Sequence, residues 1–302
     1  MKLFRVIRPT NVRSANRTKS KTLMLLTAIT VLATLPISVA LSAQQKFTTI
    51  DVPGATDTAA EAINPRGDIV GLYNDSSGNG HGFLLSKGTF TTIDVPGSTL
   101  TQALGINPQG KIVGDYTDSR GNFHGFLLSK ATFTTIDVPG ATLTAAFGIN
   151  PQGEIVGLYI DSSGNGHGFL LSNGTFTTVD VPGAIFTEAS QIDPQGDIVG
   201  VYFDSSGNEH GYLLSKGKFT TIDVPGAIFT ETFGINPQGD IVGDYADSSG
   251  NEHGFLLSKG KFTAIDVPGA TFTAAFAINP RGGIVGQYAD SVGNTHGFLL
   301  SK

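Results

Sequence analysis

The stretch from Phe133 to Thr175, FTTIDVPGATLTAAFGINPQGEIVGLYIDSSGNGHGFLLSNGT, decides the fold, because the chain contains six copies of it. The phenylalanine that opens each copy recurs every 43 residues, without insertion or deletion, as Phe47, Phe90, Phe133, Phe176, Phe219 and Phe262. A fixed period in the low forties is typical of repeat architectures. The fold can therefore be derived from what one copy must form.

One copy holds four short runs of residues that favour β-strands. In the third copy these runs are Thr144–Asn150, Glu154–Asp161, His167–Ser172 and Phe176–Val181. The breaks between them are Asn-Pro-Gln-Gly, Ser-Ser-Gly-Asn and Asn-Gly, and Pro-Gly closes the copy. Asn-Pro-x-Gly suits a type I turn and Asn-Gly is a strong hairpin signal. Four antiparallel strands in about 43 residues match one propeller blade. The sequence predicts an all-β, six-bladed β-propeller.

The phase of the repeat predicts how the ring closes. The chain enters the repeat at a fourth strand, Phe47–Val52, and leaves it at a third strand, His296–Ser301. Pairing of these two would close the ring and cover its open edge. A transmembrane β-barrel would need strands of about 9–11 residues, and an open solenoid would need atypical terminal repeats. We expect one monomeric domain over residues 44–302.

The first 43 residues differ from the rest and read as an export signal. Residues 1–21 carry seven basic side chains and no acid, and residues 22–43 are almost wholly apolar or small, ending in Leu-Ser-Ala. The apolar run is also long enough to span a bilayer, so an uncleaved anchor is the alternative. We expect a bacterial protein that is exported to the periplasm or the outside of the cell.

The charge of the remaining chain excludes some partners. Residues 44–302 carry 12 basic and 25 acidic side chains, a formal charge of −13. Nucleic-acid binding depends on Lys and Arg that neutralise phosphates, so no nucleic acid is expected, and membrane contact is expected only through an uncleaved N-terminal segment. The chain has no cysteine, so no disulfide contributes to stability. We expect a protein or a glycan of the cell surface as partner.

The motif G-I-N-P-x-G-x-I-V-G-x-Y at Gly148–Tyr159, followed by His167-Gly168-Phe169, resembles the bacterial HAF family of probable extracellular repeats. The resemblance covers roughly residues 45–302. All six copies depart from it by having Gly where that family usually has Ala. The resemblance implies export and a repeat fold, and it implies no established activity.

All six histidines of the chain occupy one repeat position, His81, His124, His167, His210, His253 and His296. This position opens the third strand, two strand spacings out from the innermost one, so neighbouring histidines would lie roughly 15 Å apart. That is too far for a shared metal, and no metal site is expected. We expect a structural role, with each His bonded to the Asp across its own hairpin, as Asp161 to His167.

Three other residue types recur in every copy and could contact a ligand. The loop between the second and third strands begins with Asp75, Asp118, Asp161, Asp204, Asp247 or Asp290. A calcium ion would need more oxygens than this loop offers, so a solvated turn is favoured and no cofactor is expected. A second Asp series, such as Asp180, precedes Val-Pro-Gly, where an Asx-type turn is expected. The Tyr series, such as Tyr159, could stack on a sugar or pack between blades.

Antiparallel strands place the loops after second strands and the connections after fourth strands at the same end of the ring. That end should therefore be acidic and should bind the ligand. The candidate ligand-binding residues are the six loop aspartates, Asp75, Asp118, Asp161, Asp204, Asp247 and Asp290, together with Phe123, Glu209 and Glu252. The opposite end should carry lysines such as Lys216, Lys218 and Lys259.

The sequence favours an exported, non-catalytic binding or interaction scaffold. A multivalent, lectin-like carbohydrate-binding propeller is one alternative. A propeller hydrolase or lyase is the other, and it would need one blade with acids or bases that the others lack. The copies differ mostly by conservative or surface substitutions, and no catalytic residue is expected.

Overall fold

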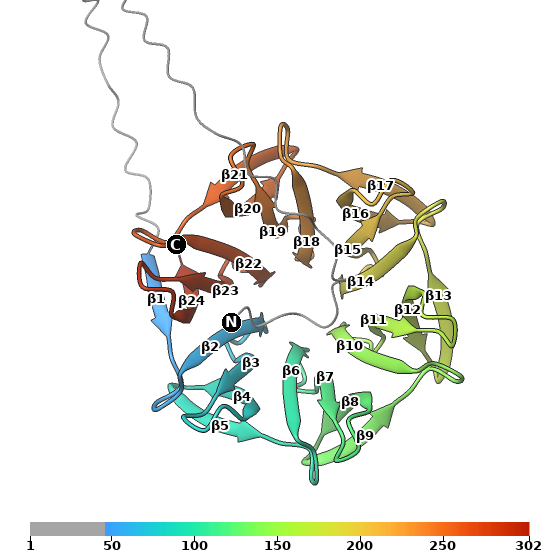
Figure 1. Ribbon diagram of the computed structural model, residues 1–302, viewed down its shortest axis with the longest axis vertical. Coiled ribbons are helices and arrows are strands. Elements are labelled where there is room, and N and C mark those ends of the chain that lie inside the picture. Colours follow the sequence, from blue (N-terminus) through green and yellow to red (C-terminus); the bar gives the residue numbers. More distant parts are fainter. Residues whose placement is uncertain (1–45, 302) are drawn as a thin grey trace, which may run out of the picture. The chain divides into compact units, whose positions relative to one another are not determined.

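The computed structural model describes residues 46–301, which form 24 strands in six four-stranded blades around a common axis (Figure 1). The innermost strands are β2 (Asp57–Ile63), β6 (Leu100–Ile106), β10 (Leu143–Ile149), β14 (Phe186–Ile192), β18 (Phe229–Ile235) and β22 (Phe272–Ile278). The second strands are β3 (Ile69–Asn74), β7 (Ile112–Thr117), β11 (Ile155–Ile160), β15 (Ile198–Phe203), β19 (Ile241–Ala246) and β23 (Ile284–Ala289).

The third and fourth strands complete each blade toward the rim. The third strands are β4 (Gly80–Ser86), β8 (Phe123–Ser129), β12 (Gly166–Ser172), β16 (Glu209–Ser215), β20 (Glu252–Ser258) and β24 (Thr295–Ser301). The outer strands are β5 (Thr89–Ile93), β9 (Thr132–Ile136), β13 (Thr175–Val179), β17 (Lys218–Ile222), β21 (Lys261–Ile265) and β1 (Lys46–Ile50). The predicted six-bladed propeller is confirmed, with strand ends shifted by one or two residues. We number the blades 1 to 6 in chain order.

The ring closes as the phase of the repeat predicts. Strand β1 pairs antiparallel with β24, from Lys46 opposite Ser301 to Ile50 opposite Gly297. The rings of Phe47 and Phe298 pack edge to face with centroids 5.7 Å apart. Blade 6 is thus built from both ends of the described chain. The predicted export signal lies outside the described residues. Within residues 46–301 no helix is long and apolar enough to cross a membrane.

The core lies between neighbouring blades. Val156, on the second strand of blade 3, is fully buried against Tyr212 and Val179, on the third strand of blade 4 and the outer strand of blade 3. The same layer of valines and aromatic rings recurs around the ring, so each blade buries its apolar surface on its two neighbours. Burial of such side chains stabilises a fold by about 1.5–3 kcal/mol each.

Every innermost strand carries a β-bulge at the same repeat position, for example between Ala60 and Ala62 in blade 1. A bulge inserts one extra residue and turns its side chain away from the regular alternation. In blade 1 that extra residue is Glu61. The bulge therefore gives each blade one re-aimed side chain on the strand nearest to the axis.

Candidate functional site

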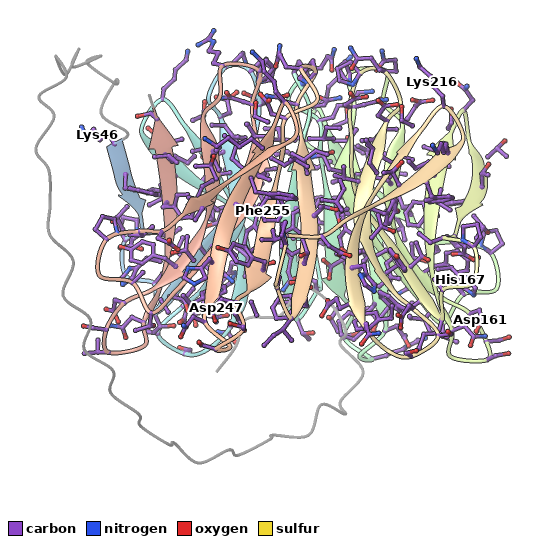
Figure 2. All side chains as sticks on the ribbon, turned by 90° about the horizontal axis from the view of Figure 1, so that it is seen from above. Lys46, Asp161, His167, Lys216, Asp247 and Phe255 are labelled. Atoms are coloured by element: carbon purple, nitrogen blue, oxygen red, sulfur yellow. The ribbon has the colours of Figure 1, made fainter. Side chains whose placement is uncertain are left out.

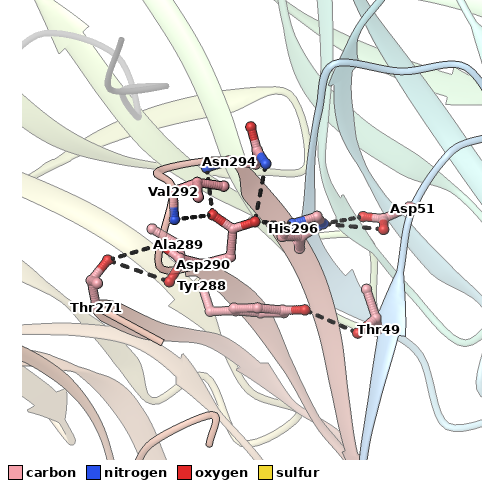
Figure 3. Close-up of polar contacts among 9 residues, drawn as sticks. All are labelled: Thr49, Asp51, Thr271, Tyr288, Ala289, Asp290, Val292, Asn294 and His296. Carbon is pink, nitrogen blue, oxygen red and sulfur yellow. Dashed lines mark hydrogen bonds and ion pairs between the residues drawn. The ribbon is translucent and has the colours of Figure 1, made fainter. Parts of the chain in front are cut away.

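Each blade carries an equivalent group of polar side chains at one end of the disc, which we call the surface cluster; its threonine is replaced by Ala264 in blade 5. In blade 6 it consists of Tyr288, His296, Asp290, Asp51 and Thr49 (Figure 3). His296 lies between two carboxylates, with Nδ1 3.0 Å from Asp51 Oδ1 and Nε2 3.5 Å from Asp290 Oδ2. The Tyr288 ring stacks on the imidazole at 5.1 Å, and the Tyr288 hydroxyl hydrogen-bonds Thr49 Oγ1 at 3.0 Å.

The strand register builds this group. Tyr and His are direct cross-strand neighbours on the second and third strands, as Tyr159 and His167 are in blade 3. The loop Asp is held by its own turn, where Asp161 Oδ1 accepts the N–H groups of Ser163 and Asn165 at 2.8 and 2.9 Å. The side-chain hydrogen bond from Asn165, then the backbone one, lowers the pKa of Asp161 to about 2. The loop aspartate is therefore a fixed anion at neutral pH.

The histidine contacts the expected loop aspartate, but its shorter hydrogen bond is with a second carboxylate. His167 makes its short hydrogen bond with Asp180, Nδ1 to Oδ2 at 2.7 Å, while its Nε2 lies 3.6 Å from Asp161 Oδ2. Asp161 is already engaged by its own loop, whereas Asp180 directly follows the strand that pairs with the His strand on the other side. The second Asp series therefore anchors the histidines, in place of the expected Asx-type turn.

The Tyr series packs between blades, one of the two roles expected for it. The Tyr202 ring packs on the buried core shared by blades 3 and 4, and its hydroxyl hydrogen-bonds Thr221 Oγ1 at 2.9 Å. The same Tyr–Thr bond forms in every blade except blade 5. There Ala264 replaces the threonine, and burial raises the pKa of Tyr245.

The surface clusters are accessible from outside. The histidine side chains are 24–28 % exposed and the aspartates after the outer strands are 39–52 % exposed. Between blades 3 and 4 the cluster borders a cleft of about 580 Å³, lined by the connection 181–184, Tyr202, Asp204, Phe219 and Thr221. A ligand in that cleft would meet apolar rings and a carboxylate together.

The two ends of the disc differ in charge as expected. Figure 2 shows Asp161, Asp247 and His167 near one edge and Lys216 and Lys46 at the opposite edge. The other candidate residues, Phe123, Glu209 and Glu252, open the third strands beside the acidic loops and are half-buried. In the described part of the chain no three His, Asp or Glu side chains are arranged to hold a metal ion.

Sequence reasoning missed a second group of acids. The differences between copies were expected to be conservative or superficial, yet several buried positions near the axis carry an acid in one or two blades only. These side chains are Glu61, Asp115, Glu188, Glu231 and Asp244. The signal was present in the aligned repeats: Glu188 and Glu231 stand where blade 3 has Ala145, and Asp115 stands where it has Leu158.

Comparison with known proteins shows the fold. No protein-family model matches the chain, and no curated protein matches it. AofleA from Arthrobotrys oligospora superposes with a TM-score of 0.53 at 12 % identity, over 84 % of this chain and 86 % of that one. A fucose-recognising lectin of Aleuria aurantia gives 0.50 at 12 % identity, over 81 % and 91 %.

TolB from Acinetobacter baumannii superposes with a TM-score of 0.51 at 19 % identity, over 82 % of this chain. The chain spans about half of the length of TolB (55 %). Because no family model matches, membership of the extracellular repeat family is not shown, and only the resemblance of the repeat motif stands. By its architecture the chain is a six-bladed β-propeller, similar in fold to fungal lectins and to TolB.

Proposed function

We propose that this chain is a non-catalytic, multivalent binding protein whose six surface clusters take hydroxyl-rich ligands of the carbohydrate class. The observation that carries the proposal is the repetition of one half-exposed group of Tyr, His and two Asp in all six blades. Blade 6 completes its copy with Thr49 and Asp51 from the opposite end of the chain. A catalytic site needs one such group, whereas avidity needs several.

The chemistry of the cluster suits sugars. Its carboxylates offer fixed acceptors for hydroxyl groups, and the neighbouring cleft offers the apolar Tyr202 and Phe219 rings. Specific pockets commonly combine apolar walls with a few placed polar groups. The Aleuria aurantia lectin, of the same fold, binds Fucα1-6GlcNAc, and this likeness supports the class of ligand.

The acidic end also favours a second candidate, a cationic protein surface. Fields of one sign attract partners of the opposite sign, and such binding weakens with salt. Export to the periplasm or the cell surface, inferred from residues 1–43, belongs to the same proposal.

The test is binding of the purified chain to a glycan array and to a sensor surface that carries a dense glycan. The variant Asp137→Asn, Asp180→Asn, Asp223→Asn removes the most exposed carboxylate from three blades. We expect it to dissociate at least about ten-fold faster, because avidity falls with the number of intact sites. The matched control, Lys87→Ala, Lys130→Ala, Lys259→Ala in the hairpin turns of the opposite end, should bind as the wild type does.

Two outcomes contradict the proposal. Absence of binding to any glycan, with salt-sensitive binding to a basic protein, would favour the second candidate. Loss of glycan binding in the lysine variant alone would move the site to the other end of the disc.

A further inference from the structure

Two exposed isoleucines break the six-fold pattern of the acidic end. Large apolar side chains are exposed at three positions of residues 46–301, and two of these are Ile185, 59 % exposed, and Ile228, 60 % exposed. Both directly precede the innermost strands of adjacent blades, 4 and 5 (Figure 1). The Ile185 N–H donates to the carbonyl of Phe203, which ends the second strand just before the loop that begins with Asp204. The isoleucines therefore stand at the end of the disc that carries the loop aspartates.

The fold does not require isoleucine at this position. The other four blades carry a threonine, whose hydroxyl donates to the carbonyl oxygen at the end of the second strand at 3.3–3.4 Å. These residues are Thr56, Thr99, Thr142 and Thr271. Isoleucine cannot form this bond, and it leaves more than half of its apolar surface in water. Contact with a partner would bury that surface, which is favourable.

The register of the sheets places a glutamate between the two isoleucines. In blade 4, Phe186 lies opposite Phe203, and Phe203 lies opposite Glu209 on the third strand. This strand, β16, contacts β18, which follows Ile228 directly. In the equivalent strands of blades 3 and 4 the first residues, Gly166 and Phe186, are paired. Around the ring, Glu209 therefore comes after Ile185 and before Ile228.

Blade 5 contains the same arrangement. The Ile228 N–H donates to the carbonyl of Ala246 at 2.8 Å, and Ala246 lies opposite Glu252 on the third strand. The other blades carry no charge at the position of the glutamates, where they have Gly80, Phe123, Gly166 and Thr295. We call Ile185, Glu209, Ile228 and Glu252 the apolar–acidic patch. It occurs once per chain, on blades 4 and 5.

The charges around the apolar–acidic patch have one sign. Hydrogen bonds, first that from the side chain of the loop asparagine, lower the pKa of Asp204 and of Asp247 to about 2, so both are anions at neutral pH. Residues 185–270 contain no arginine, and their lysines lie in or beside the hairpin turns at the opposite end: Lys216, Lys218, Lys259 and Lys261. Complementary charges favour association, so a partner should be basic where it faces the carboxylates and apolar where it faces the isoleucines. An anionic membrane surface has the wrong charge.

We propose that the apolar–acidic patch docks one extended segment of another protein, in which apolar and basic side chains alternate along one face. Three strand spacings separate Ile185 from Ile228 along the blade, a path of roughly 14 Å. Every second side chain of an extended segment shares a face, and four residues span about 13 Å. Apolar side chains four residues apart would contact the isoleucines, and basic side chains between and after them would face Glu209 and Glu252. The inference does not rest on glycan binding by the surface clusters.

The experiment measures binding of three fluorescently labelled heptapeptides to the full chain by fluorescence anisotropy. The probe peptide Leu-Ser-Lys-Ser-Leu-Ser-Lys carries the proposed pattern. The serine peptide Ser-Ser-Lys-Ser-Ser-Ser-Lys lacks the apolar side chains, and the glutamate peptide Leu-Ser-Glu-Ser-Leu-Ser-Glu reverses the charge. We expect one probe peptide per chain, binding that weakens with salt, at least about ten-fold weaker binding of the serine peptide because apolar burial is lost, and no binding of the glutamate peptide.

Three variants locate the binding. Ile185→Thr, Ile228→Thr introduces the residue of the other four blades and should bind the probe peptide at least about ten-fold more weakly. Glu209→Gln, Glu252→Gln keeps the shape of the side chains and should lower both the affinity and its dependence on salt. The matched control Val292→Ser removes the third exposed apolar side chain, at a position where four other blades have serine, and should bind as the wild type does.

The proposal is overturned by an absence of one-to-one binding of the probe peptide, by unchanged affinity in Ile185→Thr, Ile228→Thr, or by loss of binding in Val292→Ser alone. Equal affinity for the probe and serine peptides also overturns it. That last result would still agree with a cationic partner for the acidic end as a whole, so failure of the patch is distinguishable from failure of the proposed function. Glycan binding by the surface clusters is measured separately and is unaffected by these outcomes.

Discussion

Replacement of Asp115 by leucine should stabilise the propeller, although it changes a fully buried residue. Asp115 keeps its proton up to about pH 8 in the folded chain, because burial and then Glu61 raise its pKa from 3.8. In the unfolded chain the carboxyl ionises at its ordinary pKa. Stability is therefore greatest at low pH and is lost as the pH rises toward the folded pKa. Each pH unit in this window costs about 1.4 kcal/mol.

At pH 7 the buried carboxyl thus destabilises the fold by about 4 kcal/mol, and Asp115→Leu removes this cost. The assay is urea unfolding followed by circular dichroism at pH 5, 6, 7 and 8. The gain from the substitution should grow steadily over this range. The reciprocal control Leu158→Asp, at the same position of blade 3, should lose stability with a similar dependence on pH. A gain that does not change with pH, or a loss of stability in Asp115→Leu, would refute the reasoning.

Three further predictions concern single blades. Ala131 has a positive φ of 63° in a turn where other blades have Gly, so Ala131→Gly should raise the free energy of unfolding by about 1 kcal/mol, and an unchanged melting temperature would contradict this. Ala264→Thr gives the Tyr245 hydroxyl the partner that the other blades have, and should gain about 0.5–1.5 kcal/mol; the gain should vanish when Tyr245→Phe is added. The hydrogen bond to Asp266 raises the pKa of His253 above 6.5. The stabilisation of the fold by the pair of protonated His253 and Asp266 is full below pH 6.5 and is lost as the pH rises through the raised pKa of His253. An NMR titration should show Asp266→Asn lowering that pKa, and no change would contradict the pairing.

The fold could be predicted because its signals are local. Hairpin turns need residues that accept a positive φ, and Asn173-Gly174 adopts φ values of 50° and 78° as the dipeptide predicts. The period of 43 residues sets one blade, and the number of copies sets six. The end at which the loop aspartates gather also follows, because antiparallel strands alternate in direction. The pairing of β1 with β24 needed only the phase of the repeat.

The sequence predicted one carboxylate partner of each histidine and could not show that a second one lies closer, because both carboxylates lie within a few residues of the same hairpin. Asp161 and Asp180 both belong to the blade of His167, and only the loop geometry shows that Asp161 is already engaged. The choice depends on a difference of 0.9 Å between 2.7 and 3.6 Å. Sequence separation carries no such information.

By itself the sequence determined the blade, the number of blades, the closure of the ring and the acidic and basic ends, because periodicity and turn chemistry act between near neighbours in the chain. Tertiary structure alone decided that Glu61 and Asp115, from blades 1 and 2, interact around the axis. Electrostatic energy depends on distance and burial in space, and residues 54 positions apart acquire both only when blades 1 and 2 pack against each other.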